Sequence, residues 1–368
     1  MSSQIGQLFE RDLWCFFGLP IDNVNLAEAN NICQKHVSSR EKLFVSTPNV
    51  NFLIGSLNDS DFYDSVLASD LVLVDGMPIV WISRLMGIPV RERVAGSDLF
   101  ESFVGGELAS QVFFFGGNEG TAERACASLN ERNISTKCSG FLNPGRGSIE
   151  SMSSNEIIDQ INASSPDFVV VSLGAKKGQQ WIQRNRKRLN APLISHLGAV
   201  VNFTAGTVER APACLQTMGG EWLWRVWQEP VLLKRYLSDG LQLANLMVFK
   251  LLPLLVYSRY LKFFSQAGNS SITTVIEGDK AVLHLKGHFT VLDRASLGHA
   301  VLSCHSKAPS LHIECSGMTY IDPYLVGNII VLKRLILESG GGFEFTCGNP
   351  VISKLIRLNN ATAYLEKE

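Results

Sequence analysis

The 368-residue sequence has few charged residues and almost no net charge. Asp, Glu, Lys and Arg make up 18% of the chain, whereas about 25% is usual for soluble domains. The formal net charge of −1 excludes the basic surface that nucleic-acid binding requires, so no nucleic-acid partner is expected. Hydrophobic residues make up 46%, and the mean hydropathy of +0.11 is high for a soluble protein. This composition predicts a large buried core and indicates a membrane-facing surface.

The eight cysteines lack the spacing of a metal site. None forms a CxxC pair, and none lies near histidines at the spacing of zinc ligands. We therefore expect no metal and no other cofactor, and we expect reduced, mostly buried thiols. The first residues, MSSQIGQLFERDLW, lack a basic region followed by an apolar core, so they are not expected to form a signal peptide. The length favours two domains over one.

The stretch SDLVLVDGMPIVW, residues 69–81, carries the clearest sign of chemistry. Its apolar residues 71–74 predict a short buried strand that ends at Asp75-Gly76, followed by a helix over 77–86. Ligands of open α/β sheets bind beyond the carboxyl ends of strands. A carboxylate at such an end, followed by Arg91 and Arg93, suits chemistry on a phosphorylated substrate. The alternative is that Asp75 only caps the helix by accepting hydrogen bonds from its free amides.

Polar residues or glycines follow two further predicted strands. The strand over 42–46 ends at Thr47-Pro48-Asn49, whose short side chains are able to bond a ligand oxygen but are also ordinary loop residues. The strand that begins at Gln111 is followed by Gly116-Gly117 and a helix over 121–129. Backbone amides approach a phosphate at such a turn, although a tight turn needs glycine without any ligand.

The segment Asp59-Ser60-Asp61 contains an Asp-x-Asp pair, a pattern that holds a divalent cation against a nucleotide diphosphate. It lies between two predicted helices rather than after a strand, so capping of a helix is its expected role. Further strands are predicted over 167–173 and 192–197, with a helix over 181–189 and an irregular, polar segment over 202–212. Four or five strand–helix alternations in about 190 residues predict a parallel sheet with helices on both faces.

Seven motifs, in order, make residues 15–240 resemble the WecG/TagA/CpsF glycosyltransferase family, also called glycosyltransferase family 26. They are GLPID (18–22), TPN (47–49), SDLVLVDGMPIVW (69–81), ERVAGSDL (92–99), FFFGG (113–117), NFTAGTVERAP (202–212) and GGEWLWRVWQEP (219–230). The resemblance implies a Rossmann-like α/β core with a helical C-terminal appendage. It implies inverting, metal-independent transfer from a UDP-sugar to a polyprenyl-diphosphate-linked sugar, in bacterial exopolysaccharide or cell-surface glycan biosynthesis.

The same resemblance assigns roles to single residues. Asp75 matches the proposed general base, which takes a proton from the acceptor hydroxyl, and Thr47 and Asn49 match polar catalytic positions. Cations stabilise the departing UDP when no metal is used, and those of the appendage are thought to close over the site. The expected substrate-binding residues are Arg93, Gly116, Gly117, Gln179, Arg225, Lys234 and Arg235.

Two positions depart from the family pattern. The active-site glutamine of the family falls on Gly178, so its contact is lost unless Gln179 replaces it, and Asn202 stands where an aspartate is common. Both changes leave the proposed base in place. They also leave an alternative: a weakly active or inactive UDP-sugar-binding scaffold that regulates a polysaccharide assembly complex.

The glycosyltransferase core is expected over 1–230 and a membrane-associating appendage over 231–265. Charged residues and Pro253 interrupt the apolar residues of the appendage, so no uncharged apolar run reaches the roughly eighteen residues of a spanning helix. An apolar helix flanked by basic and aromatic residues suits the membrane interface. We expect a cytoplasmic protein held peripherally at the inner face of the cell membrane, with a helix buried between two domains as the alternative.

A polar linker over 266–271 precedes a region of different character, 272–368. Its predicted strands over 281–286, 310–315 and 343–347 and helices over 294–303, 324–339 and 351–358 resemble a STAS domain. A turn is expected over 287–289. Asp322 is followed by Pro323 and Tyr324 instead of a phosphorylatable serine, so we interpret this small α/β domain as a module that docks a protein partner. A homo-oligomer is left open.

Overall fold

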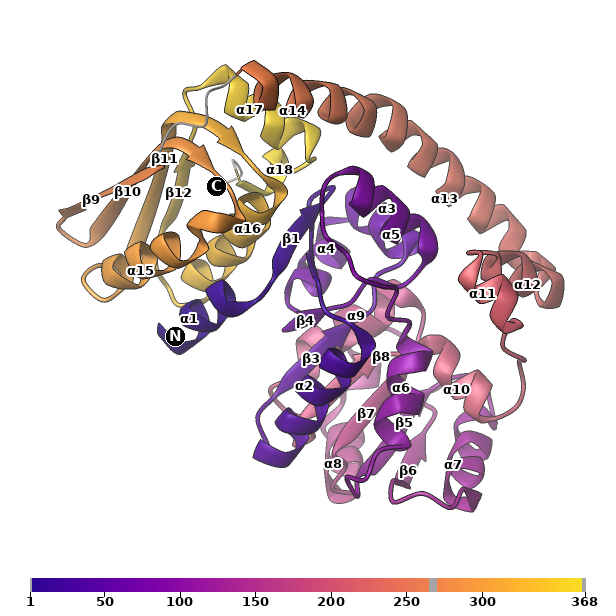
Figure 1. Cartoon of the computed structure of the whole chain (residues 1–368). Helices are drawn as coiled ribbons and strands as arrows, with labels where there is room; N and C mark the ends of the chain where they lie inside the picture. The colour runs from indigo at the N-terminus through magenta and orange to yellow at the C-terminus, as the bar shows by residue number, and fades with distance from the viewer. Residues whose placement is uncertain (1, 265–269, 366–368) are drawn as a thin grey trace. The chain divides into compact units, whose positions relative to one another are not determined.

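The computed structural model describes residues 2–264 and 270–365 (Figure 1). They form two compact units. The larger unit comprises Val24–Trp81 and Val90–Leu241, and the smaller unit comprises Met1–Asn23, Ile82–Pro89 and Gln242–Glu368. The boundaries expected at 230 and 271 stay predictions, and residues 265–269 of the expected linker lie outside the described residues.

The larger unit is built on a six-stranded sheet in the order β4-β3-β8-β7-β5-β6. Every pair of neighbouring strands is parallel, which confirms the predicted fold class. The strands are β3 (Leu43–Ser46), β4 (Leu71–Val72), β5 (Gln111–Gly116), β6 (Lys137–Leu142), β7 (Phe168–Ser172) and β8 (Leu193–His196). The carboxyl ends of all six therefore lie at the same edge of the sheet.

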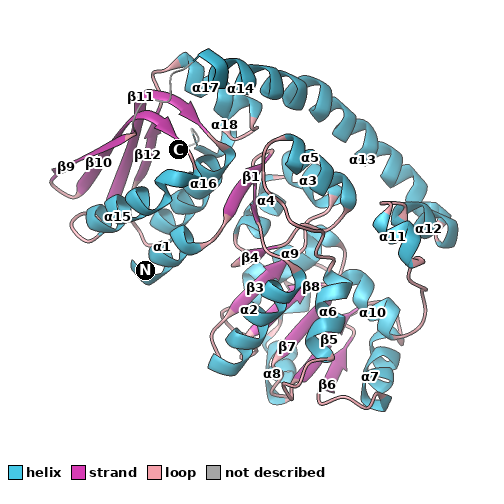
Figure 2. Cartoon of the chain, in the orientation of Figure 1, coloured by secondary structure: helices cyan, strands magenta, loops and turns pink. Residues whose placement is uncertain are grey.

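Both faces of this sheet are buried under helices (Figure 2). Along β7, Phe168 and Val170 pack into one core cluster, whereas Val169 and Val171 pack into the other. This alternation explains why the strand is apolar throughout instead of at every second residue. The first cluster includes α2 (Leu26–Ser39), α6 (Gly96–Val104), α7 (Thr121–Glu131) and α10 (Gly198–Thr204). The second includes α8 (Asn155–Ala163) and α9 (Ala175–Asn185).

Several predicted boundaries in this unit were wrong. Helix α9 begins at Ala175 instead of 181, because buried residues recur at helical spacing from Gly178 onward. Helix α10 takes the first residues of the segment expected to be irregular, 202–212. The remaining helices near the sheet edge are α3 (Val50–Asn58), α4 (Ser60–Leu67) and α5 (Met77–Leu85).

A disulfide joins Cys126 of α7 to Cys138 of β6, so the expectation that all cysteines are reduced was wrong for these two. The six other cysteines are free thiols, and Cys214 is the exposed one among them.

Helices lead from the larger unit into the smaller one. They are α11 (Ala213–Thr217), α12 (Glu221–Gln228), the short turn η2 (Pro230–Leu232), α13 (Leu233–Leu246), the π-helical turn η3 (Met247–Leu251) and α14 (Leu252–Phe264). The helical run Pro230–Leu261 is long and apolar enough to cross a membrane by length and composition, with a hydropathy of 1.5 over its most apolar window.

The smaller unit contains a four-stranded sheet in the order β12-β11-β10-β9. Strands β10 (Lys280–Phe289), β11 (Ser310–Ile321) and β12 (Phe343–Thr346) are parallel, and β9 (Ser271–Glu277) is antiparallel to β10. The turn expected over 287–289 was wrong, because β10 pairs with β11 through Phe289. Its helices are α15 (Arg294–His305), α16 (Pro323–Glu338), α17 (Pro350–Leu358) and α18 (Thr362–Leu365). The STAS resemblance stays a prediction.

The N-terminal segment packs against α16 in this smaller unit. It forms α1 (Ser2–Glu10) and a hairpin of β1 (Leu13–Phe16) and β2 (Leu19–Asp22). The buried Asn328 side chain donates to the carbonyl of Leu13 over 3.1 Å, and the rings of Trp14 and Tyr324 meet edge to face with centroids 5.5 Å apart. The packing of this segment against α16 was not predicted from the sequence.

We predict that Gly327→Ala destabilises the protein. A Cβ atom on Gly327 would lie 2.8 Å from the backbone of Trp14 and Cys15, and this backbone is unable to yield as a flexible side chain would. Overpacking of this kind lowers the free energy of unfolding by about 1–3 kcal/mol, which denaturant titration of the full chain measures. Gly6→Ala in α1 is the matched control, since nothing lies within 4 Å of its Cβ position. Equal midpoints for Gly327→Ala and Gly6→Ala would contradict the close packing of hairpin and helix.

Candidate active site

Asp75 lies just beyond the carboxyl edge of the larger sheet. After β4 the chain continues in extended form, since the Leu73 amide donates to the carbonyl of Ser46 over 2.8 Å and the Asp75 amide to that of Pro48 over 2.9 Å. Gly76 then turns the chain with a φ of +109°, a backbone conformation that favours glycine. The pattern of a strand ending at Asp75 is thereby confirmed, although β4 itself is shorter than predicted.

Thr47 and Asn49 flank Asp75 from the end of β3. Thr47 is buried, and its Oγ1 lies 3.2 Å from the Cβ position of Gly96 at the start of α6. Asn49 caps α3, because its Oδ1 accepts a hydrogen bond from the Phe52 amide over 3.2 Å. Its Cβ lies 3.9 Å from the Cβ position of Gly76, next to Asp75. Asn49 therefore has an ordinary structural role as a helix cap, and its backbone neighbourhood includes Gly76; a catalytic role stays a prediction.

Arg93 and Arg225 act electrostatically on Asp75, and Arg210 is linked to Arg93 through Asp98; we call these three residues the arginine cluster. Arg93 is 12% exposed and donates from Nη1 to Oε2 of Glu221 over 2.6 Å. Its Nη2 lies 3.3 Å from Oδ2 of Asp98, which also forms an ion pair with Arg210. Arg210 and Arg225 both lie over the ring of Phe203, at 6.0 and 5.7 Å from its centroid.

The surroundings of Asp75 raise the pKa of its carboxyl from 3.8 to about 7. The largest cause is loss of solvation, which disfavours the charged form. Arg93 and Arg225 lower this pKa, whereas Glu221 and Asp98 raise it. A carboxylate with a pKa near the working pH is suited to general base catalysis, because it both accepts a proton and is ionised often enough to do so.

The capping role considered for Asp75 is not observed. Among the described residues, no amide of α5 donates a hydrogen bond to its carboxylate. In contrast, the capping role expected for Asp59 is confirmed, because its Oδ1 accepts from the Phe62 amide over 2.8 Å at the start of α4. Asp59 also forms an ion pair with Lys176.

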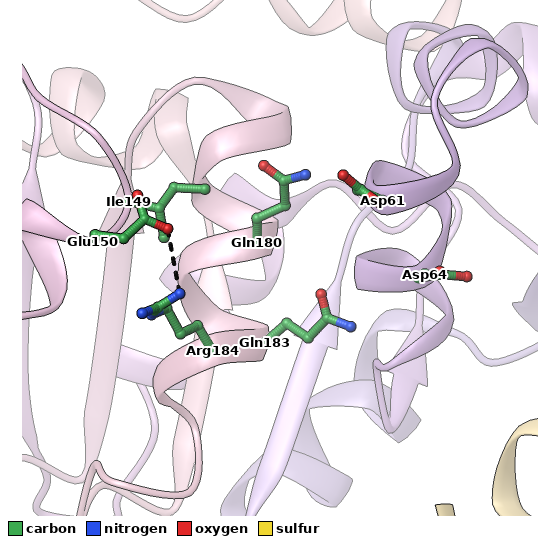
Figure 3. Close-up of a pocket in the computed structure, with 7 residues that line it drawn as sticks. All are labelled: Asp61, Asp64, Ile149, Glu150, Gln180, Gln183 and Arg184. Atoms are coloured by element: carbon green, nitrogen blue, oxygen red, sulfur yellow. Dashed lines mark hydrogen bonds and ion pairs between the residues drawn. The ribbon is translucent and has the colours of Figure 1, made fainter. Parts of the chain in front are cut away.

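Asp61, the second acid of that pair, lines a polar surface hollow of about 310 Å³ between α4 and α9 (Figure 3). The hollow contains an ion pair of 3.3 Å between Arg184 and Glu150. None of the predicted site residues lines it. The hollow is therefore separate from the candidate active site at Asp75.

Gly116 and Gly117 lie at the same sheet edge as Asp75, but at the end of β5. Strands β3, β8 and β7 separate β5 from β4, a spacing of about 19 Å at 4.8 Å per neighbouring strand. Both glycines have positive φ, and a Cβ on Gly116 would lie 2.5 Å from the carbonyl oxygen of Ser172. The Gly117 amide donates to that same oxygen over 2.7 Å. These contacts require glycine for packing, and a role in substrate binding stays a prediction.

The other predicted substrate-binding residues are Gln179, Lys234 and Arg235, and their roles stay predictions. Gln179 is fully buried, and its Oε1 accepts a hydrogen bond from Ser46 Oγ over 3.0 Å. It therefore lies buried at the carboxyl end of β3, against Ser46, the residue next to Thr47 in the chain, and its role in substrate binding stays a prediction. Lys234 and Arg235 are exposed at the start of α13, where Arg235 lies over the ring of Tyr236.

Gly178 has a packing reason to be glycine in this chain. A Cβ on it would lie 2.1 Å from Cδ2 of His196, whose Nε2 lies 2.6 Å from the carbonyl oxygen of Leu173. His196 is buried, and burial lowers its pKa. The imidazole occupies the space next to α9 where a longer residue at 178 would begin. Asn202 lies in α10, where its carbonyl oxygen accepts hydrogen bonds from the amide and hydroxyl of Thr207.

Three residues near Asp75 were missed as site residues in the sequence: Asp98, Arg210 and Glu221. Each lies inside one of the motifs that carried the family resemblance, and membership of such a motif was the sequence signal that could have identified it as a site residue. Their roles depend on partners far along the chain, since Glu221 contacts Arg93 across 128 positions.

Residues 14–255 match the model of the glycosyl transferase WecG/TagA/CpsF family. A protein named N-acetylglucosaminyldiphosphoundecaprenol N-acetyl-beta-D-mannosaminyltransferase, from Bacillus subtilis strain 168, is 25% identical over 60% of this chain and 85% of its own length. Proteins of the same name from Bacillus spizizenii strain W23 and Staphylococcus aureus strain NCTC 8325 are 32% and 22% identical, over 48% and 51% of this chain and 68% and 72% of their own lengths. Because the family match spans well over half of the chain, the protein belongs to the WecG/TagA/CpsF family of glycosyltransferases.

Proposed function

We propose that this glycosyltransferase moves a sugar from a UDP-sugar to a sugar carried on a polyprenyl diphosphate, with Asp75 as general base. The observation that carries the proposal is the desolvated Asp75 carboxyl, with a pKa of about 7, beside Arg93 and Arg225. The names of the relatives support the acceptor class, since each includes a sugar on undecaprenyl diphosphate.

In the proposed reaction, the Asp75 carboxylate takes the proton of the acceptor hydroxyl while that oxygen attacks the anomeric carbon of the donor. The bond from this carbon to the diphosphate oxygen breaks, and UDP leaves with the electron pair. Arg93 and Arg225 stabilise the negative charge that develops on the diphosphate. Attack from the face opposite to the leaving group inverts the anomeric configuration. Thr47 and Asn49 provide polar contacts beside the reacting atoms.

The alternative function is a scaffold that binds a UDP-sugar without efficient transfer and acts through the C-terminal region as a docking module. One observation favours it: the family's active-site glutamine is absent, and His196 fills the space beside Gly178. Incubation with a panel of UDP-sugars and lipid-linked diphosphates, followed by mass spectrometry of the products, separates the two functions. Binding of UDP without any transferred sugar would support the scaffold.

We also propose that α12 and α13 hold the protein at the cytoplasmic face of the membrane. Helix α13 buries an acidic side chain and exposes leucines, the reverse of a helix that faces water. Asp239 is 8% exposed and accepts a hydrogen bond from Asn51 over 3.1 Å, whereas Leu237 and Leu241 are 58% and 73% exposed. At 100° per residue, both leucines lie on the side of the helix away from Asp239. Trp222, Leu223 and Trp227 add exposed apolar surface on α12. An acidic residue inside and leucines outside suit contact with lipid better than contact with water.

Asp75→Asn is predicted to lower the rate of sugar transfer by about 10²–10⁴-fold, the usual contribution of a general base. Affinity for UDP, measured by calorimetry, is expected to stay close to that of the parent, since the diphosphate contacts remain. Asp61→Asn is the matched control, because it makes the same chemical change at an exposed carboxylate outside the site. Transfer by Asp75→Asn at the parental rate would refute the assignment of the base.

The kcat/KM for transfer is predicted to rise with pH to a plateau, with a midpoint near the Asp75 pKa of about 7, because the base must be ionised in the free enzyme. Ionisation of Asp75 has the opposite effect on protein stability, because it lowers the free energy of unfolding as pH rises. Its folded pKa lies above the ordinary 3.8, so its contribution to stability is complete below about pH 4 and is lost as pH rises through about 7. Asp75→Asn should therefore gain stability relative to the parent between pH 4 and 7. A pH-independent difference in unfolding free energy would contradict the raised pKa.

Leu237→Glu combined with Leu241→Glu is predicted to release the protein from vesicles of phosphatidylglycerol and phosphatidylcholine in a sedimentation assay. Two charges would have to enter the lipid interface, where each is strongly disfavoured. Ser238→Glu with Asn245→Glu adds the same charge on the flank of the helix and should retain binding.

Extraction of native membranes with alkaline carbonate tests the peripheral attachment, and protein left in the pellet would indicate a spanning helix instead.

A further inference from the structure

Glu221 and Arg225 lie one turn apart on α12, so both side chains project from the same face of this helix. Glu221 accepts a hydrogen bond from Arg93 over 2.6 Å, and both side chains are largely shielded from solvent. Gln216 of α11 also faces Arg93, with its Oε1 3.5 Å from Nη2. Arg225, on the same face of α12 as Glu221, acts electrostatically on Asp75.

Apolar packing does little to orient α12 in the larger unit. None of its residues is fully buried, and Trp222, Leu223 and Trp227 are exposed. Polar contacts attach it instead: Trp224 Nε1 and Gln228 Nε2 both donate to the carbonyl of Glu209, over 3.1 and 3.0 Å. Those two bonds tie α12 to the neighbouring segment of chain. Glu221 is the α12 residue that links this helix to Arg93, the arginine that acts on the proposed catalytic carboxylate.

We propose that Glu221 is a positioning residue whose ion pair with Arg93 fixes the rotation of α12 and thereby aims Arg225 at the diphosphate. The inference rests on the proposed function of Arg93 and Arg225 as diphosphate ligands. Glu221 itself touches neither the donor nor the reacting atoms. It also keeps the Arg93 guanidinium in place before the donor binds, together with Asp98 on the other terminal nitrogen.

A double-mutant cycle tests whether Glu221 acts through Arg225. Glu221→Ala is expected to weaken UDP affinity about tenfold in the parent, because Arg225 loses its orientation. In an Arg225→Ala background, the same change is expected to cost less than about twofold, since the group that it positions is already gone. Glu229→Ala is the matched control: it removes the same charge from the end of α12 and should leave UDP affinity unchanged.

A second readout distinguishes positioning from a merely structural role. Glu221 raises the pKa of Asp75, so Glu221→Gln should move the midpoint of the pH–rate profile to lower pH, with thermal unfolding close to that of the parent. An unshifted midpoint would contradict the geometry.

The outcomes of the cycle separate the two levels of the proposal. If Arg225→Ala alone binds UDP as the parent does, the proposed role of Arg225 is wrong and the proposed function loses one of its diphosphate ligands. If Arg225→Ala weakens UDP binding and Glu221→Ala still weakens it further by its full effect, the positioning role of Glu221 is refuted. The proposed role of Arg225 then stands. Tighter UDP binding by Glu221→Ala would overturn the inference too, because Glu221 would then compete with the diphosphate for Arg93.

Discussion

A partly shielded carboxylate under the electrostatic influence of guanidinium groups is the constraint on which the candidate site depends. Loss of solvation pushes the Asp75 pKa up, and Arg93 and Arg225 pull it down, so that it settles near neutrality. Asp98 and Glu221 limit the influence of the arginines, since they neutralise part of the positive charge. A bound diphosphate would add negative charge beside Asp75 and raise its pKa further. The donor would thus strengthen the base that acts on the acceptor.

The hydrophobic core of the larger unit, which packs on both faces of the sheet, fixes the position of Asp75. Strands buried on both faces are rigid, and their carboxyl ends bring Thr47, Asn49 and Asp75 to one edge. The arginine cluster is different, because loops and the unburied helix α12 supply it. Strands of this core therefore position the proposed base, whereas contacts between charged side chains position the groups proposed to hold the leaving diphosphate.

Much of the fold could be predicted from the sequence because local patterns specify it. The continuous apolar run of β7 and the regular alternation of strands and helices indicate a parallel sheet, and Asp75 directly follows one of those strands. Strand β9 was missed because it is exposed along almost its whole length and has no alternation of apolar residues. The start of α9 was missed because Gly178 looks like a helix breaker. Arg210 and Glu221 were missed because only tertiary contacts bring them to Asp98 and Arg93.

The close approach of Gly178 to His196 has a consequence for how this chain relates to its family. The imidazole and a side chain at position 178 compete for one volume, so the two positions are epistatic. A glutamine grafted at 178 from a relative meets a steric barrier until a smaller residue replaces His196. A single exchange at position 178 therefore tests steric fit against His196 together with the chemistry of the new side chain, and only the paired exchange separates the two.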